Sequence, residues 1–184
     1  MTLALSRDPL LRSLLRSLFV SVGVALIFNG LPLQKAFASG DAWRSADSVL
    51  VVKNERRLYL LRDGQPFKTY KVALGLNPYG RKEKEGDYRT PEGSYVLDLR
   101  NASSEYFLSL HVSYPNERDQ ENAHRHRWAP GGAIMIHGLP NVLHRSAAYY
   151  RISDWTDGCI ALNNDDMLEV WLLTHDNTPI EIRP

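Results

Sequence analysis

The sequence predicts a mainly β domain with one clear α-helix near its C-terminal end. Short apolar runs rich in β-branched and aromatic residues recur along the chain, and polar or glycine-containing segments separate them. Only the segment after residue 163 combines capping residues with an apolar stripe at helical spacing. The 184 residues, 43% hydrophobic and 23% charged, suffice for one domain with a hydrophobic core.

The N-terminal segment differs from this pattern and resembles a secretory signal. Three arginines (Arg7, Arg12 and Arg16) precede the apolar run 18–33, which ends in Ala36-Phe37-Ala38. A basic start, a short apolar stretch and an A-x-A site are the parts of a signal peptide, so we expect cleavage after Ala38. Residues 39–47 would then be a short linker before a domain at 48–183. An uncleaved membrane anchor is the alternative that the sequence leaves open.

The first strands are expected at 49–52, 58–61 and 67–74. The polar segment 53–57 separates the first two runs, which predicts a hairpin. Asp63-Gly64 predicts a second tight turn. The three runs therefore predict an antiparallel meander.

The middle of the chain alternates loops with strands. Residues 75–89 are polar and contain three glycines and one proline, so we expect a surface loop. Thr90-Pro91-Glu92-Gly93 predicts a tight turn into a strand at 94–99. Residues 107–114 alternate apolar and polar residues as a half-buried strand does, and 115–130 is expected to be a second polar loop.

His111 lies on the polar face of the strand at 107–114, together with Ser109 and Ser113. A histidine at such a place is most often a solvent-facing or hydrogen-bonding residue. A role as partner of a catalytic group is the alternative.

The last part of the chain holds a buried strand, a connection, the helix and a final strand. Residues 133–136 form a continuous apolar run that ends at His137-Gly138. Residues 139–152 are a connection with a helical turn expected near 142–150. Asn163 or Asn164 can cap the helix, and 179–182 is the last expected strand. The helix stripe consists of Met167, Leu168, Val170 and Trp171.

Charge and cysteine content limit the possible partners of the protein and the possible roles of its cysteine. With 22 basic and 21 acidic residues, the net charge of +1 gives no long-range field that would attract nucleic acid or an anionic membrane. The single cysteine, Cys159, cannot form an internal disulfide, although exported proteins usually pair their cysteines. Cys159 is therefore a reactive thiol, an intermolecular link or a buried residue.

A reactive thiol needs a base, because only a small fraction of free cysteine is thiolate at neutral pH. His137 is the best candidate among six histidines, since it leaves a buried strand and precedes a glycine that permits close approach. A backbone carbonyl can orient its ring. Backbone N–H groups at Gly158-Cys159 could form an oxyanion hole. Acyl transfer is the reaction class that uses these groups.

Three motifs resemble the catalytic domain of L,D-transpeptidases, the cysteine enzymes of bacterial peptidoglycan. They are Thr90-Pro91-Glu92-Gly93, Ile136-His137-Gly138 and Thr156-Asp157-Gly158-Cys159-Ile160. The resemblance covers about 48–182 and implies two packed sheets with the catalytic pair in a groove. It also implies that Cys159 is the nucleophile, His137 the general base and then acid, and Gly138 the residue whose carbonyl orients His137.

The resemblance further implies a periplasmic enzyme that needs neither metal nor organic cofactor. Its partners would be peptidoglycan stem peptides, with contact to the membrane only through the transient signal peptide. Candidate substrate contacts are Thr156, Asp157, Gly158, Arg89 and Arg145. An exposed arginine without a role, and an Asp157 that only caps its turn, are the alternatives for these residues.

Two positions depart from the family pattern. Many members carry a histidine two residues before the cysteine and an arginine or asparagine two residues after it, where this chain has Asp157 and Ala161. Substrate choice is expected to differ there. A diaminopimelate amine as acceptor would give 3-3 cross-links, a protein amine would give an attached lipoprotein, and water would make the protein an L,D-carboxypeptidase or amidase. A non-catalytic wall-binding protein is the alternative from another class.

Overall fold

The computed structural model describes residues 45–184. The predicted signal at 1–38 and most of the predicted linker lie outside the described residues. Within 45–184, no helix has both the length and the apolar character needed to cross a membrane.

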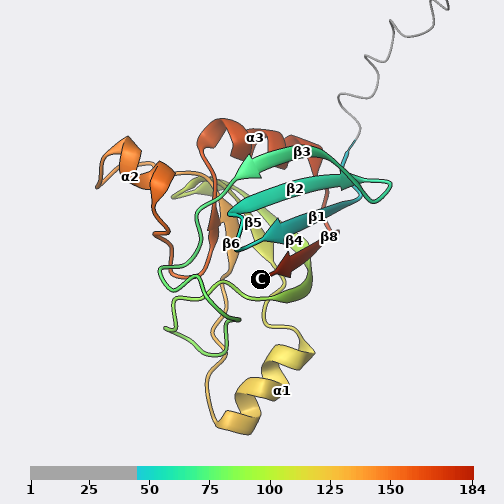
Figure 1. Cartoon of the computed structure of the whole chain (residues 1–184), viewed down its shortest axis with the longest axis vertical. Coiled ribbons are helices and arrows are strands. Elements are labelled where there is room, and N and C mark those ends of the chain that lie inside the picture. The colour runs from blue at the N-terminus through green and yellow to red at the C-terminus, as the bar shows by residue number, and fades with distance from the viewer. Residues whose placement is uncertain (1–44) are drawn as a thin grey trace, which may run out of the picture. The chain divides into compact units, whose positions relative to one another are not determined.

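The described residues form a mainly β fold of eight strands and three helices, which confirms the predicted class (Figure 1). The strands run in the order β3-β2-β1-β8-β4-β5-β6-β7. Their bounds are β1 Ser48–Val52, β2 Arg57–Arg62, β3 Gln65–Lys71, β4 Gly93–Ser104, β5 Phe107–Val112, β6 Met135–His137, β7 Ile160–Ala161 and β8 Thr178–Arg183. The helices are α1 Glu117–His126, α2 Ala147–Ile152 and α3 Asn164–Leu173. The expected meander is found, because β2 pairs antiparallel with both β1 and β3.

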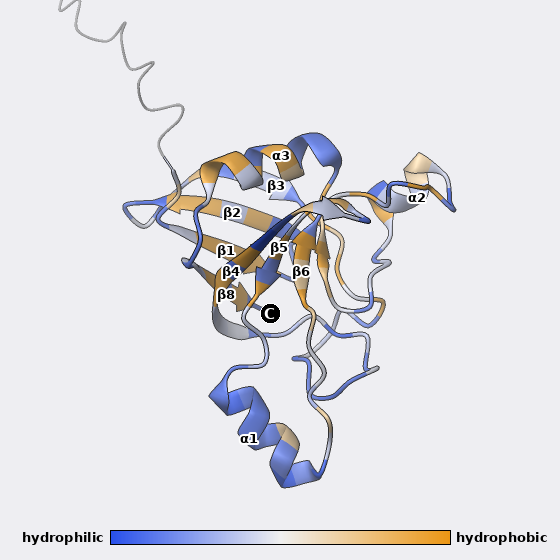
Figure 2. Ribbon diagram, turned by 180° about the vertical axis from the view of Figure 1, so that it is seen from behind, coloured by the Kyte–Doolittle hydropathy of each residue, from blue (hydrophilic) through white to orange (hydrophobic). Residues whose placement is uncertain are grey.

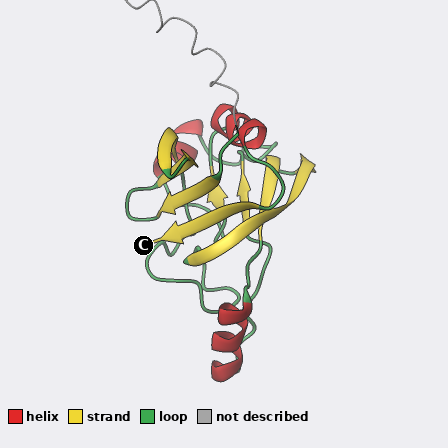
Figure 3. Ribbon diagram, turned by 90° about the vertical axis from the view of Figure 1, so that its right-hand side faces the viewer, coloured by secondary structure: helices red, strands yellow, loops and turns green. Residues whose placement is uncertain are grey.

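The strands belong to one curled sheet, where two packed sheets were implied by the family resemblance (Figure 3). The cause is β4, which pairs with β8 through its first residues and with β5 through the rest. Two register irregularities along the β4–β5 pairing allow the sheet to bend. After β3 the chain also forms a bridge from Ala73 to Ala161 of β7, so the two edges of the sheet approach each other.

The core lies on the inner face of this curled sheet. Val49, Val51, Ile180 and Ile182 alternate with more exposed neighbours along the central strands β1 and β8, as the period of two requires. Helix α3 closes the core with Met167, Val170 and Leu173, which are buried. In the predicted stripe Leu168 is instead exposed, and Trp171 is only partly buried against the core.

Helix α1 lies in the segment 115–130, for which the loop prediction was wrong. Asn116 and Asp119 form a reciprocal capping box, in which each side chain accepts a hydrogen bond from the other residue's backbone N–H. The helix projects from the sheet and is mostly hydrophilic (Figure 2). Only Asp119 and Ala123 are buried, so there was no apolar stripe by which to detect it.

Candidate active site

The parallel pairing of β6 with β7 brings the two predicted catalytic residues together. Ile136 lies opposite Ile160, and both side chains are fully buried in the core. Because side chains alternate along a strand, His137 projects to the other face of the sheet, and Cys159 is the residue directly before β7. His137 is the register partner of Ala161, so Cys159 lies diagonally across from it on the neighbouring segment.

His137 is held in one tautomer and one orientation. Its Nδ1 lies 2.7 Å from the carbonyl oxygen of Gly138. A carbonyl only accepts hydrogen bonds, so Nδ1 carries the proton and Nε2 keeps a lone pair. Burial lowers the pKa of His137 to about 4, although the bond to Gly138 opposes this shift. The residue is therefore a neutral imidazole at neutral pH, able to accept a proton at Nε2.

Gly138 is required at its position by close packing. A Cβ there would lie 2.7 Å from Asn164 Oδ1 and 3.1 Å from the carbonyl oxygen of Tyr106. Its N–H donates to the carbonyl oxygens of Tyr106 and Leu108. These contacts fix the peptide whose carbonyl orients His137.

Cys159 is partly buried and rests against the first residues of β6. Its Sγ accepts a hydrogen bond from the Met135 N–H at 3.4 Å and lies 3.6 Å from the Ala133 carbonyl oxygen. Burial raises the pKa of the Cys159 thiol, and the carboxylate of Asp157 raises it further, whereas the Met135 N–H and the Lys82 ammonium lower it. The resting pair is thus a thiol beside a neutral imidazole.

The turn before Cys159 is built by Thr156 and Gly158. The Thr156 hydroxyl donates to the Cys159 carbonyl at 2.7 Å and accepts from the Gly158 N–H at 3.2 Å. Gly158 has φ 131° and lies against the Arg89 carbonyl, 2.7 Å from where a Cβ would be, so other residues would be strained there. Of the two N–H groups predicted for an oxyanion hole, only that of Cys159 lacks a hydrogen-bond partner within residues 45–184.

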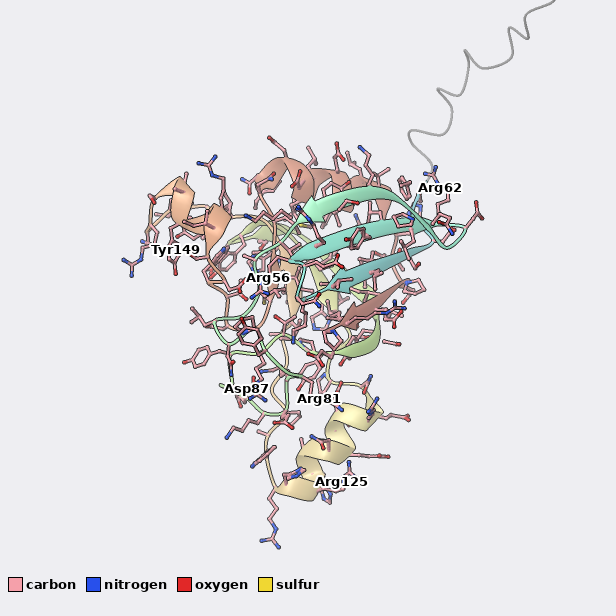
Figure 4. The ribbon with its side chains drawn as sticks, viewed as in Figure 1. Arg56, Arg62, Arg81, Asp87, Arg125 and Tyr149 are labelled. Atoms are coloured by element: carbon pink, nitrogen blue, oxygen red, sulfur yellow. The ribbon has the colours of Figure 1, made fainter. Side chains whose placement is uncertain are left out.

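The predicted loop at 75–89 forms one wall beside this turn, and Asp87 holds it together. Its carboxylate accepts bonds from the Lys82 ammonium at 2.8 Å and from the backbone N–H groups of Glu83, Lys84 and Arg89. Lys82 is only 4% exposed. Figure 4 shows Asp87 on the side of the sheet from which α1 projects.

The side chains of the remaining predicted substrate contacts lie against other groups or in solvent. The Arg89 guanidinium contacts Glu83 and the Arg81 carbonyl within its own loop. The Arg145 guanidinium lies over the ring of Tyr149, 5.8 Å from the ring centroid. Tyr149 belongs to α2 (Figure 4). Asp157 is exposed. Their roles in substrate binding stay predictions.

Sequence reasoning missed the aromatic side chains around His137. The Tyr106 and Trp155 rings lie with their centroids 4.6 Å and 5.6 Å from that of His137. The same two residues line a cavity of about 430 Å³, which Pro140, His144 and Tyr150 help to enclose. Trp155 directly precedes the motif that begins at Thr156, but no pattern indicated that Tyr106 would meet it.

Comparisons with known proteins found a matching family and similar sequences. The family described as YkuD, L,D-transpeptidase catalytic domain, matches residues 46–182. The "Putative L,D-transpeptidase YafK" of Escherichia coli K12 is 27% identical over 96 residues, which are 49% of this chain and 37% of YafK.

Solved structures show the same fold. The helical cell shape determining protein Pgp2 of Campylobacter jejuni is 29% identical with a TM-score of 0.56, over 73% of this chain and 46% of that chain. An L,D-transpeptidase of Xylanimonas cellulosilytica has a TM-score of 0.51 at 15% identity, over 76% of this chain and 61% of that chain. The match thus spans less than half of the length of YafK and Pgp2.

Proposed function

Because this chain belongs to the family of L,D-transpeptidase catalytic domains, we propose that it transfers acyl groups of peptidoglycan tetrapeptide stems through a thioester on Cys159. The observation that carries the proposal is the pairing of β6 with β7. It sets a thiol directly before β7 and an oriented, neutral imidazole at the end of the neighbouring strand β6. The proposed location is the periplasm, after removal of the segment that ends at Ala38.

The first half-reaction forms the thioester. The Cys159 sulfur attacks the carbonyl carbon of the third, diaminopimelate-type residue, while the thiol proton moves to Nε2 of His137. The peptide bond to the terminal D-alanine then breaks, and the imidazolium returns the proton to the leaving amine. The Cys159 N–H is the donor available to the carbonyl oxygen as its negative charge develops.

The second half-reaction releases the acyl group to an acceptor. A diaminopimelate amine would yield a 3-3 cross-link, and a protein amine would yield an attached lipoprotein. In each case His137 accepts the proton that the attacking amine loses, and the Cys159 thiol re-forms. Pgp2 is described as a helical cell shape determining protein, which supports a role of this wall chemistry in cell shape.

The test is incubation of the purified protein with tetrapeptide muropeptides, followed by intact mass spectrometry and product separation. A tripeptidyl adduct on Cys159 and dimeric products are expected. Cys159→Ala should fold and form no adduct, and His137→Gln should form it far more slowly. Shortened monomers alone would make the protein a carboxypeptidase, and no adduct with any stem peptide would favour the non-catalytic wall-binding alternative.

A further inference from the structure

A second imidazole–carboxylate pair lies on the sheet beside Cys159. His111 on β5 places its Nδ1 2.6 Å from Asp98 Oδ1 on β4. Both side chains are partly open to solvent, with 22% and 34% of their surfaces exposed. None of the catalytic steps above uses this pair.

The register of the sheet puts this pair in line with the nucleophile. His111 lies opposite Met135, and the Met135 N–H donates to Cys159 Sγ. Their chain neighbours Leu110, Ile136 and Ile160 are fully buried in the core. The side chains of His111 and Met135 therefore project to the same outer face, and the Cys159 Sγ lies next to this row at the Met135 N–H. Adjacent strands are about 4.8 Å apart, so His111 lies about 10 Å from Cys159 along this row.

The pair offers only hydrogen-bond acceptors to a ligand when its imidazole is neutral. A carboxylate cannot donate, so the proton of the His111–Asp98 bond belongs to Nδ1, and Nε2 presents a lone pair. Asp98 Oδ2 is a second acceptor. Within residues 45–184, neither atom has a protein hydrogen-bond partner. Two acceptors and one negative charge fit a primary ammonium group.

We propose that His111 and Asp98 form a subsite for the primary amine at the far end of a diaminopimelate-type side chain. The inference rests on the proposed function, which brings such a side chain to Cys159. Met135, between the nucleophile and the pair, offers an apolar contact to the methylene groups that connect the reacting centre with the amine. The amine belongs either to the stem that acylates Cys159 or to the acceptor stem.

Binding tests the subsite without any chemistry. In the purified full chain carrying Cys159→Ala, a tetrapeptide with a free side-chain amine should bind about tenfold to a hundredfold more tightly than its N-acetylated form, because one charged hydrogen bond is lost. Adding Asp98→Asn should weaken binding of the free-amine peptide by that factor and leave the acetylated peptide unchanged. Calorimetric titration measures the affinity of both peptides for the Cys159→Ala protein and for the Cys159→Ala protein that also carries Asp98→Asn.

Glu181→Gln is the matched control, since Glu181 is also a strand carboxylate in an ion pair, with Arg183 on β8. It should leave the preference for the amine intact. Equal affinities for the two peptides in the Cys159→Ala protein would overturn the subsite. Equal weakening of both peptides by Asp98→Asn would also overturn it, because that is the result of a purely structural role.

Acylation assays with Cys159 present then identify the stem that supplies the amine. Slower thioester formation from an acetylated donor places the donor in the subsite, whereas unchanged acylation with slower transfer to an acetylated acceptor places the acceptor there. Discrimination in binding without any thioester would end the proposed transferase activity and leave the amine subsite standing.

Discussion

At the scale of single residues, the lowered pKa of His137 makes the stability of the fold depend on pH. Burial holds its pKa at about 4, below the value near 6.5 of an unfolded histidine. The unfolded chain therefore binds a proton first as the pH falls. The contribution of His137 is fully present above pH 6.5 and is lost as the pH drops toward 4.

We expect the free energy of unfolding to fall by about 2 to 4 kcal/mol across this window from His137 alone. Urea titrations at several pH values measure it. His137→Gln should remove this part of the pH dependence, whereas His144→Gln, which changes an exposed histidine, should keep it. An unchanged slope in His137→Gln would show that the imidazole is not held neutral by burial.

The thiol of Cys159 provides a second residue-scale prediction. Burial raises its pKa, and the Asp157 carboxylate adds to the shift, so alkylation by iodoacetamide should have its midpoint above that of a free cysteine, near pH 8.5. Asp157→Asn removes the repelling charge and should move the midpoint to lower pH. Alkylation rates between pH 6 and pH 10, followed by mass spectrometry, measure both midpoints. Glu85→Gln, an exposed change in the loop at 75–89, is the control and should leave the midpoint unchanged.

The residues that sequence could predict are those whose local pattern shows their chemistry. Cys159 was prominent as the single cysteine, and His137 as a histidine between a buried strand and a glycine. The His111–Asp98 pair depends on a bulged register between two strands, which no local pattern reveals. Tyr106 likewise meets His137 only because the β4–β5 hairpin returns to the end of β6.

At the scale of elements, the loop at 75–89 should depend on Asp87. Its carboxylate pairs with Lys82, and both side chains are almost fully buried. Asp87→Asn would leave the Lys82 charge without its partner, so we expect a loss of about 3 to 5 kcal/mol of unfolding free energy. Denaturant unfolding measures it, with Glu85→Gln as the exposed control in the same loop. A loss no larger than that of the control would contradict the role given to the buried pair.

The elements were predicted as far as their apolar patterns allowed. Strands β1, β2 and β8 were found close to their predicted places, because their buried residues alternate. Strand β3 begins and ends earlier than the predicted 67–74, at Gln65 and Lys71, and its burial does not alternate. Helix α1 was missed, since its stability comes from caps and from the bonds of Asp119 to Tyr95 and Arg81. The two-residue strand β7 is too short to produce a pattern of its own.

At the scale of the whole molecule, curling of the sheet creates the site. The mainly β class followed from composition and turns, but a single continuous sheet depends on β4 pairing with two neighbours at once. The approach of the two sheet edges brings Leu74 and Gly75 against Thr156. The turn that presents Cys159 is thus held by residues from opposite ends of the sheet order, a long-range arrangement that sequence patterns do not contain.

The last strand should therefore be required for the whole fold, although it lies at the end of the chain. Strand β8 pairs in parallel with β1 and antiparallel with β4, so it joins the meander to the half that carries His137 and Cys159. Ending the chain after Asn177 would remove the buried residues Ile180 and Ile182 and expose two strand edges.

We expect this truncated chain to lose its cooperative unfolding transition and its acylation by stem peptides together. Circular dichroism during thermal unfolding and intact mass spectrometry measure the two losses. A chain that lacks only Pro184 keeps every pairing of β8 and should unfold and react like the full protein. If the shorter chain still unfolded cooperatively, the meander and the catalytic half would have to be stable without the strand that joins them.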